Sequence, residues 1–326
     1  MRAALYRSTG PAHEVLEIVD LEIPEPQPGE IRVRIVTSGI NPTDWKTRAG
    51  IMQRPPDGFQ IPHHDGAGVV DAIGEGVTGL EVGQRVWLYL AAFGNRYGTA
   101  AEYAVVPSGR AVPLPHNASY DLGACLGVPA LTAAHCLGGD PEALHGQTVL
   151  VAGGAGAVGH YAIELAKHAG ARVVATVSTD EKRVLAEAAG ADLVVRYADE
   201  DAAQKILDTV GPVDRIVEVA LKANLNLDLA VLGAPATISV YAVAGEMELP
   251  VGRFMTENTT LSFVLLYGLT PVQLAAAVEW TYTALADDAL TPLPVLPFAL
   301  DEVAEAHEEA TRKRVGKVVV RIGDQS

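Results

Sequence analysis

The chain has 326 residues, which is long for one domain and comfortable for two. Hydrophobic residues make up 49% of it and charged residues 20%, so a sizeable core can form. The formal net charge of −16 argues against a nucleic acid partner, and no apolar run approaches the ~20 residues that span a bilayer. Cys125 and Cys136 are too few cysteines for a disulfide framework or a four-thiolate zinc site. Because the N-terminus reaches charged residues too soon for a secretory signal, we expect a soluble cytoplasmic protein.

The first 121 residues predict a β-rich, barrel-like domain, because short apolar segments alternate with turns rich in Gly and Pro. The expected strands are Val15–Ile23, Ile31–Ser38, Gly68–Ile73, Arg85–Leu90 and Ala101–Val106. A helix over Asp121–Leu137 is expected to lead out of this domain.

From Gln147 onward the pattern changes to alternating strands and helices, as a doubly wound parallel sheet requires. The expected strands are Val149–Ala152, Arg172–Val177, Leu193–Val195, Val213–Val219, Ala236–Val240 and Thr260–Leu265. The expected helices are Ala157–Ala169, Glu181–Ala189, Ala202–Val210, Leu225–Leu232 and Pro271–Ala286. Gly170 and Gly190 are expected to end two of these helices. Residues 292–322 predict a β-helix-β tail, with Asp301 as the N-cap of a helix over Glu302–Arg312.

Gly154, Gly156 and Gly159 follow the first of these strands at G-x-G-x-x-G spacing. Such a trio is a weak signal alone, but between a buried strand and an amphipathic helix it is typical of dinucleotide binding. We expect Gly154 to allow the tight turn, Gly156 to let the backbone approach a pyrophosphate, and Gly159 to let helix and strand pack closely. The helix N-terminus at Ala157 and Val158 would then offer N–H groups to the phosphates. The alternative is a glycine-rich structural loop.

Five sequence blocks together resemble a known superfamily almost from end to end. They are residues 26–31 (Pro-Gln-Pro-Gly-Glu-Ile), 39–44 (Gly-Ile-Asn-Pro-Thr-Asp), 64–70 (His-Asp-Gly-Ala-Gly-Val-Val), the glycine turn and 304–307 (Ala-Glu-Ala-His). The chain resembles the medium-chain dehydrogenase/reductase superfamily, and within it the zinc-independent, zeta-crystallin-like quinone oxidoreductase branch. The resemblance implies an α/β protein with a GroES-like catalytic domain over residues 1–121 and 267–326 and a Rossmann domain over residues 122–266. It also implies an active site in the cleft between these domains.

The resemblance implies that no zinc ion is bound. Zinc-dependent relatives use a cysteine where this chain has Asn41, a histidine in the block that holds His64, and a later cysteine near Val128. Catalytic zinc needs three protein ligands, and these residues do not supply them. The structural-zinc lobe is also replaced by a short loop, residues 91–98. His63 and His64 could still bind a metal together with Asp65, but hydrogen-bonding roles are the expected ones.

NADPH is the expected cofactor, because the tip of the second Rossmann strand lacks the carboxylate that binds an NAD ribose. Ser178 can instead hydrogen-bond a 2′-phosphate, and Lys182 and Arg183 can neutralise it. Similar enzymes use a lysine at the position of Lys182 and a tyrosine at that of Tyr197. The alternative is that Lys182 and Arg183 are solvated helix charges. The resemblance also implies nicotinamide contacts from Thr132, Val240 and Tyr241.

The expected reaction is hydride transfer from NADPH to a quinone or a small activated enone. Asn41 is expected to donate to a substrate carbonyl or to the ribose, and Asp44 to order the loop or the ribose hydroxyls, although both can be ordinary turn residues. Where similar enzymes carry tyrosines, this chain has Lys46 and Met52. Lys46 could stabilise an oxyanion or lie on the surface. The substrate cleft would also contain Trp45, Met52 and His64.

The sequence leaves two alternatives open: a 2-enoyl thioester reductase on the same scaffold, and a non-catalytic NADPH-binding protein. An acyl-CoA panel and an NADPH oxidation assay distinguish them. We also expect a homodimer, paired through the apolar edge strand Thr260–Leu265 with Phe263 near its centre.

Overall fold

The computed structural model describes residues 1–52, 56–242, 245–312 and 315–323, and its chain divides into two compact units. The first unit is Met1–Val128 with Pro292–Ser326, and the second is Pro129–Thr291. These boundaries differ from the expected ones, because residues 122–128 belong to the first unit and residues 267–291 to the second. The second unit gains the helix α11 (Pro271–Ala286), which packs on the helix α6 (Ala157–His168).

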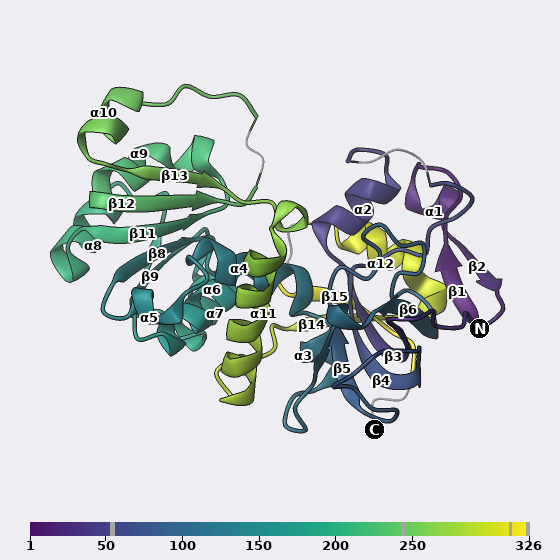
Figure 1. The fold of residues 1–326 in the computed structure, drawn as a ribbon. Helices are drawn as coiled ribbons and strands as arrows, with labels where there is room; N and C mark the ends of the chain where they lie inside the picture. The colour runs from purple at the N-terminus through teal and green to yellow at the C-terminus, as the bar shows by residue number, and fades with distance from the viewer. Residues whose placement is uncertain (53–55, 243–244, 313–314, 324–326) are drawn as a thin grey trace. The chain divides into compact units, whose positions relative to one another are not determined.

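The second unit is built on a six-stranded parallel sheet (Figure 1) with the strand order β10-β9-β8-β11-β12-β13. Its strands are β8 Thr148–Ala152, β9 Arg172–Val177, β10 Leu193–Arg196, β11 Val213–Glu218, β12 Leu232–Val240 and β13 Thr260–Phe263. The strand order reverses between β8 and β11, which makes this the Rossmann topology with its ligand-binding switch point there. The predicted doubly wound sheet is confirmed.

Helices connect these strands and cover the sheet. They are α5 Pro141–Leu144, α6 Ala157–His168, α7 Asp180–Ala188, α8 Ala202–Val210, α9 Leu221–Val231, α10 Val251–Thr256 and α11 Pro271–Ala286, with a 3₁₀ turn at Leu266–Gly268. The helices α6 and α7 pack on β8, β9 and β10, whereas α8 and α9 pack together and on β10, β11 and β12. Gly170 and Gly190 follow the ends of α6 and α7 with φ of 79° and 98°, as expected for residues that terminate helices.

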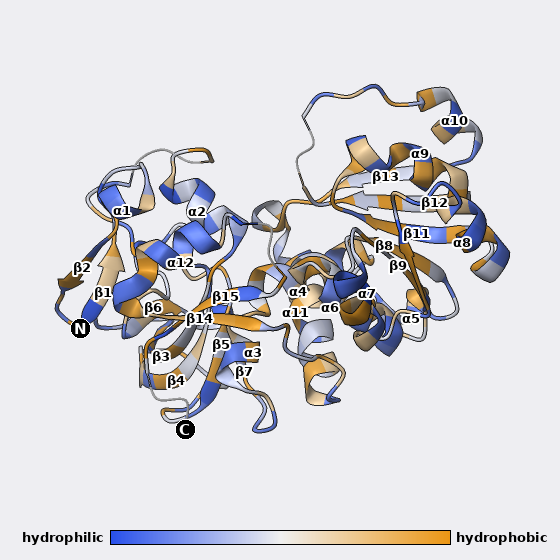
Figure 2. Cartoon of the chain, turned by 180° about the vertical axis from the view of Figure 1, so that it is seen from behind, coloured by the Kyte–Doolittle hydropathy of each residue, from blue (hydrophilic) through white to orange (hydrophobic). Residues whose placement is uncertain are grey.

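The core of the second unit consists of side chains from the sheet and its covering helices. Fully buried members include Leu150, Val174, Ile206 and Ile216. Figure 2 shows that hydrophobic residues concentrate in strands such as β8 and β9, whereas α7 and α8 carry hydrophilic residues as well. This pattern fits strands that are buried on both faces of a parallel sheet.

The first unit is a mainly antiparallel β structure that both ends of the chain complete. Its main sheet has the order β14-β15-β3-β4-β5-β7, and β6 pairs with β3. The strands are β1 Arg2–Leu5, β2 Glu17–Asp20, β3 Glu30–Gly39, β4 Asp65–Ile73, β5 Arg85–Leu88, β6 Tyr103–Pro107, β7 Ala111–Pro113, β14 Val295–Ala299 and β15 Lys317–Arg321. The helices are α1 Ala12–Val15, α2 Pro42–Arg48, α3 Tyr120–Gly123 and α12 Val303–Glu309, with 3₁₀ turns at Ser108–Arg110 and Leu300–Glu302. In the predicted β-helix-β tail, residues 313–314 lie outside the described residues.

Three local predictions were wrong. Residues 12–15 form a short helix, so the expected strand at 15–23 is only Glu17–Asp20. Asp301 lies within a 3₁₀ turn and forms an ion pair with Arg2, so Glu302 is the N-cap of α12. The expected helix at 121–137 is two helices, α3 and α4 (Gly127–Cys136).

A side chain from a distant strand accounts for this break between α3 and α4. The Asp65 carboxylate accepts hydrogen bonds from the backbone N–H of Val128, in the first turn of α4, at 2.9 and 3.0 Å. An acidic side chain at a helix N-terminus satisfies its free N–H groups. A new helix therefore begins at Gly127.

None of the helices that the structure describes has the length and apolar character of a membrane span.

Candidate cofactor and active site

The glycine turn between β8 and α6 is closely packed. Gly153 has the positive φ, 71°, so Gly153 rather than Gly154 makes the turn that we expected of Gly154. A Cβ on Gly154 would lie 2.8 Å from the Cβ of Ala175, and one on Gly159 would lie 2.4 Å from the Gly153 carbonyl oxygen. Gly154 and Gly159 therefore both permit close packing at this turn.

The turn leaves the N-terminus of α6 open for an anion. Gly156 is the N-cap residue in an extended conformation, and no side chain caps this end of the helix. The first turn begins with Ala157 and Val158, neither of which carries a polar side chain. Backbone N–H groups at a helix N-terminus bind phosphates well, so this cradle fits a pyrophosphate.

The tip of β9 carries a hydroxyl and an ammonium group side by side. The Lys182 Nζ donates a hydrogen bond to the Ser178 Oγ at 3.0 Å. Thr179, the N-cap of α7, accepts from the backbone N–H of Lys182. Arg183 is directed elsewhere, because it donates to the carbonyl oxygen of Val194 and pairs with Asp180 at 3.6 Å. Ser178 and Lys182 thus stand together at this tip, where both can contact a phosphate.

Other expected cofactor residues lie on neighbouring elements of the second unit. Tyr197 follows β10, is 48% exposed, and donates its backbone N–H to the carbonyl oxygen of Val177 at 3.2 Å. Tyr197 therefore lies beside the end of β9. Thr132 is buried within α4, and Val240 and Tyr241 stand at the carboxyl end of β12. The cofactor roles of these residues stay predictions.

A cavity of about 470 Å³ opens at the carboxyl ends of β12 and β13. None of its lining residues carries a charge: Leu221, Val240, Tyr241, Ala242, Gly245, Met247, Leu249, Phe263, Val264 and Leu265. Its volume lies in the range of small-molecule sites, and ligands of open α/β sheets bind at this edge. Val240 and Tyr241 were expected here as nicotinamide contacts, whereas lining residues such as Met247 and Leu249 follow no motif.

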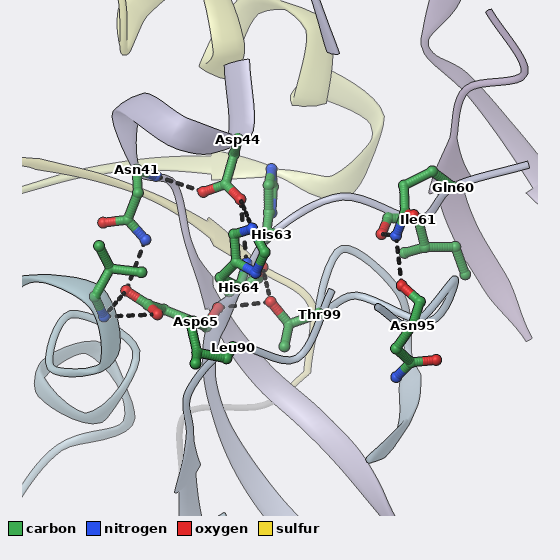
Figure 3. A network of polar contacts seen from close by, with 12 residues as sticks. Asn41, Asp44, Gln60, Ile61, His63, His64, Asp65, Leu90, Asn95 and Thr99 are labelled. Carbon is green, nitrogen blue, oxygen red and sulfur yellow. Dashed lines mark hydrogen bonds and ion pairs between the residues drawn. The ribbon is translucent and has the colours of Figure 1, made fainter. Parts of the chain in front are cut away.

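In the first unit, Asn41 and Asp44 are buried at the start of α2 (Figure 3). The Asp44 carboxylate accepts from the backbone N–H of Asn41 at 2.7 Å and from that of His64 at 3.2 Å. Burial raises the pKa of Asp44 to about 8. Asp44 thus orders the loop, one of the two roles expected of it.

The amide of Asn41 is held at both ends. Its Nδ2 donates to the Asp65 carboxylate at 2.7 Å, and its Oδ1 accepts from the Lys317 ammonium. The Lys317 Nζ also lies 4.0 Å from the Asp65 Oδ2, and both side chains are buried. One amide hydrogen of Asn41 is left for a ligand, so its expected donor role stays a prediction.

Sequence reasoning missed Lys317, which begins the strand β15. Burial raises the pKa of Asp65 to about 6 although Lys317 and Asn41 act in the opposite direction, so Asp65 is a carboxylate at neutral pH. The site therefore contains its own cation. The only signal in the sequence is a lysine placed directly before three valines.

A chain of hydrogen bonds with a fixed direction runs behind this cluster, and Figure 3 shows part of it. The Thr99 hydroxyl donates to the carbonyl oxygen of Asp65 at 2.6 Å, so it accepts from the Ser38 hydroxyl at 2.7 Å. Ser38 then accepts from the His63 Nδ1 at 2.8 Å. The His63 Nε2 is left as an acceptor for the His307 Nε2 at 2.9 Å. Both rings are neutral in this arrangement, because burial lowers the pKa of each.

We expect replacement of His307 by glutamine to reduce the acid sensitivity of the fold. Burial lowers the pKa of His307 to about 3, against 6.5 for an unperturbed histidine. Below pH 6.5 the unfolded chain takes up a proton on this histidine, whereas the native state stays neutral until about pH 3. The free energy of unfolding therefore falls as the pH falls through this range. Between pH 6.5 and 4, the free energy of unfolding of the wild type should therefore fall more steeply with decreasing pH than that of His307→Gln, by the slope that corresponds to one proton. Urea unfolding across this pH range measures the difference, and parallel slopes would contradict it.

The other expected cleft residues lie on or near α2. The Lys46 Nζ stands 5.5 Å from the centroid of the Trp45 ring in a cation–π contact, and Met52 is 47% exposed. His64 is buried, and its Nε2 lies 3.9 Å from the Asp44 Oδ1. Burial lowers the pKa of His64 to about 4 and raises that of Asp44, so this contact is not an ion pair at neutral pH. Whether Lys46 acts on a substrate stays a prediction.

Within the described residues, no group of three or more His, Cys, Asp or Glu side chains is placed to hold a metal ion. Cys125 and Cys136 are free and buried, and burial raises the pKa of each thiol to about 12.

Known proteins resemble this chain over nearly its full length. Residues 27–116 match the alcohol dehydrogenase GroES-like domain, and residues 157–282 match the family described as zinc-binding dehydrogenase. The quinone oxidoreductase of Lama guanicoe is 30% identical over 94% of this chain and 93% of its own length. That of Rattus norvegicus is 28% identical over 98% and 97%. A mycobacterial quinone oxidoreductase structure, 29% identical, covers 98% of this chain and 99% of its own, with a TM-score of 0.85.

The fold, the glycine cradle and these relatives define a medium-chain dehydrogenase/reductase. Within that superfamily, the chain belongs to the quinone oxidoreductase branch, and it is an oxidoreductase. A mycobacterial structure complexed with NADPH is 28% identical, covers 98% of this chain and 100% of its own, and has a TM-score of 0.81. The cofactor of this chain is accordingly a nicotinamide dinucleotide.

Proposed function

We propose that this protein reduces quinones or small activated enones with NADPH and without a zinc ion. The observation that carries the proposal is the uncharged cavity of about 470 Å³ at the carboxyl ends of β12 and β13. Its apolar walls favour a flat, uncharged acceptor, because burying a charged substrate group there would leave that charge unpaired. A bound nicotinamide supplies the hydride. The protein binds the phosphates at Gly156, excludes water with the cavity walls, and orients the acceptor.

Ser178 and Lys182 support the choice of NADPH over NADH. Their side chains touch at the tip of β9, where a cofactor ribose binds in this fold. A hydroxyl and an ammonium can both donate to a 2′-phosphate, whereas a bare ribose hydroxyl gains most from a carboxylate. The nearest carboxylates, Asp180 and Glu181, are exposed, and Asp180 is paired with Arg183.

Replacing Lys182 by alanine should weaken NADPH without weakening NADH. A charge-assisted hydrogen bond contributes about 1.5–3 kcal/mol, so we expect the KM for NADPH to rise roughly 10- to 100-fold. The KM for NADH should change little, because only NADPH carries the phosphate. Lys205→Ala, at an exposed lysine of α8, is the matched control. An equal loss for both cofactors in Lys182→Ala would contradict the assignment.

Lys317 supports a reaction without zinc. Its ammonium group binds Asn41 and lies 4.0 Å from Asp65, so a cation already neutralises this buried carboxylate. A divalent ion at the same place would be repelled by the ammonium group. Asn41 also stands where a thiolate ligand would be needed, and an amide is a weak ligand for zinc.

A substrate panel tests the class of acceptor. Purified enzyme with NADPH is offered para-quinones, small cyclic enones and enoyl-CoA thioesters of matched chain length. We expect the highest kcat/KM for the quinones or the enones. Faster turnover of the thioesters would favour the enoyl reductase alternative, and NADPH binding with no turnover at all would favour a non-catalytic protein.

We further infer that two copies pair through β13. This strand is at the edge of the sheet, and its Phe263 is 69% exposed. An uncovered apolar edge favours strand pairing. Light scattering at micromolar concentration should give a dimer mass, and Phe263→Lys should shift it towards the monomer. A monomeric wild type would refute the inference.

A further inference from the structure

Tyr241 lines the apolar cavity of the second unit and is its one lining residue with a hydroxyl among those that the structure describes. Its position is fixed by the sheet, because its backbone N–H donates to the carbonyl oxygen of Glu218, the last residue of β11, at 3.1 Å. The other lining residues offer only apolar side chains or none. Tyr241 is therefore the one cavity-lining residue, among those that the structure describes, whose side chain can hydrogen-bond a ligand.

The phenol of Tyr241 is in the right state to donate. Burial raises its pKa above the ordinary value, and the nearby Glu218 and Cys136 act in the same direction. The hydroxyl therefore keeps its hydrogen at every pH at which the fold is stable. Among the described residues, none forms a hydrogen bond with this hydroxyl. A protonated donor without a partner, in a cavity without charges, fits an oxygen atom of a ligand.

We propose that Tyr241 is a catalytic residue that donates a hydrogen bond to the carbonyl oxygen of the substrate. This inference rests on the proposed function. When the hydride forms the new C–H bond at the β-carbon of an enone, the C=C π electrons form a double bond between the α-carbon and the carbonyl carbon, and the C=O π electrons pass to the oxygen, which becomes negative. The Tyr241 O–H stabilises that oxygen as the charge develops. The phenol keeps its proton, and water supplies the proton that converts the enolate to the ketone.

The same contact serves quinone reduction. Hydride addition leaves a quinol anion with its charge on oxygen, and water protonates it to the hydroquinone. The apolar walls around Tyr241 strengthen the hydrogen bond, because an electrostatic interaction is stronger in a medium of low dielectric constant. The cavity thus selects uncharged carbonyl acceptors by shape and by a single donor.

The test is Tyr241→Phe, which keeps the ring and removes only the hydroxyl. With the NADPH-loaded enzyme, we expect kcat/KM for the best quinone and the best enone to fall roughly 100- to 1,000-fold, as for the loss of one oxyanion donor. The dissociation constant for NADPH should not change. Tyr282→Phe, on α11 away from the cavity lining, is the matched control and should retain full activity.

A binding measurement adds a readout that does not depend on turnover. With NADP⁺ bound, an unreactive saturated cyclic ketone should bind several-fold more weakly to Tyr241→Phe than to wild type. Wild-type activity and unchanged ketone binding in Tyr241→Phe would overturn the inference and leave the proposed function intact. Loss of NADPH binding in this variant would also overturn it, because Tyr241 would then act through the cofactor. A wild-type enzyme inactive with every acceptor would overturn the proposed function itself.

Discussion

Replacement of Lys317 by methionine is expected to destabilise the protein by about 3–5 kcal/mol, the usual effect of leaving a buried charge without its partner. Lys317 and Asp65 are both buried, with their charged atoms 4.0 Å apart. Methionine fills a similar volume but carries no charge. The Asp65 carboxylate would then retain only the hydrogen bonds from Asn41 and Val128.

Urea unfolding at neutral pH measures this effect, and a second variant isolates its cause. Adding Asp65→Asn to Lys317→Met removes the unpaired charge, so the double variant should recover part of the lost stability. Lys205→Met, at an exposed lysine, is the control and should be near neutral. A destabilisation of Lys317→Met no larger than that of the control would contradict the role assigned to this ion pair.

Replacement of Gly159 by alanine is expected to weaken dinucleotide binding roughly 10- to 100-fold, because overpacking at a rigid site typically costs 1–3 kcal/mol. The new Cβ would lie 2.4 Å from the carbonyl oxygen of Gly153 and 2.9 Å from the Cα of Gly154. Both neighbours are backbone atoms of the phosphate-binding turn, so they can move only by deforming it.

Equilibrium binding of NADPH, followed by its fluorescence, measures the effect of Gly159→Ala. Gly252→Ala in α10 is the matched control, because a Cβ there meets open space. The control should bind NADPH as wild type does. If Gly159→Ala also binds with wild-type affinity, the turn is not the phosphate site.

The parallel sheet could be predicted because its signals are local. Each strand is a short apolar run, and glycines such as Gly170 and Gly190 mark the helix ends. The strand β9 and the helices α8 and α11 have the predicted bounds. Ser178 and Lys182 could be found for the same reason, since side chains four positions apart at the start of a helix lie close together.

The polar cluster of the first unit could not be predicted, because distant parts of the chain assemble it. Lys317 contacts Asn41 across 276 positions, and His307 contacts His63 across 244. The same limit explains the expected helix at 121–137, which Asp65 interrupts from a strand far away in the sequence. Periodicity carries no information about such contacts.

The most direct measurement is the oxidation of NADPH by a simple para-quinone, repeated with NADH and with a metal chelator. The account predicts turnover that prefers NADPH, continues unchanged in the chelator, and falls in Tyr241→Phe. Turnover that prefers NADH or stops when the chelator is added would contradict the assignment of Ser178, Lys182 and Lys317.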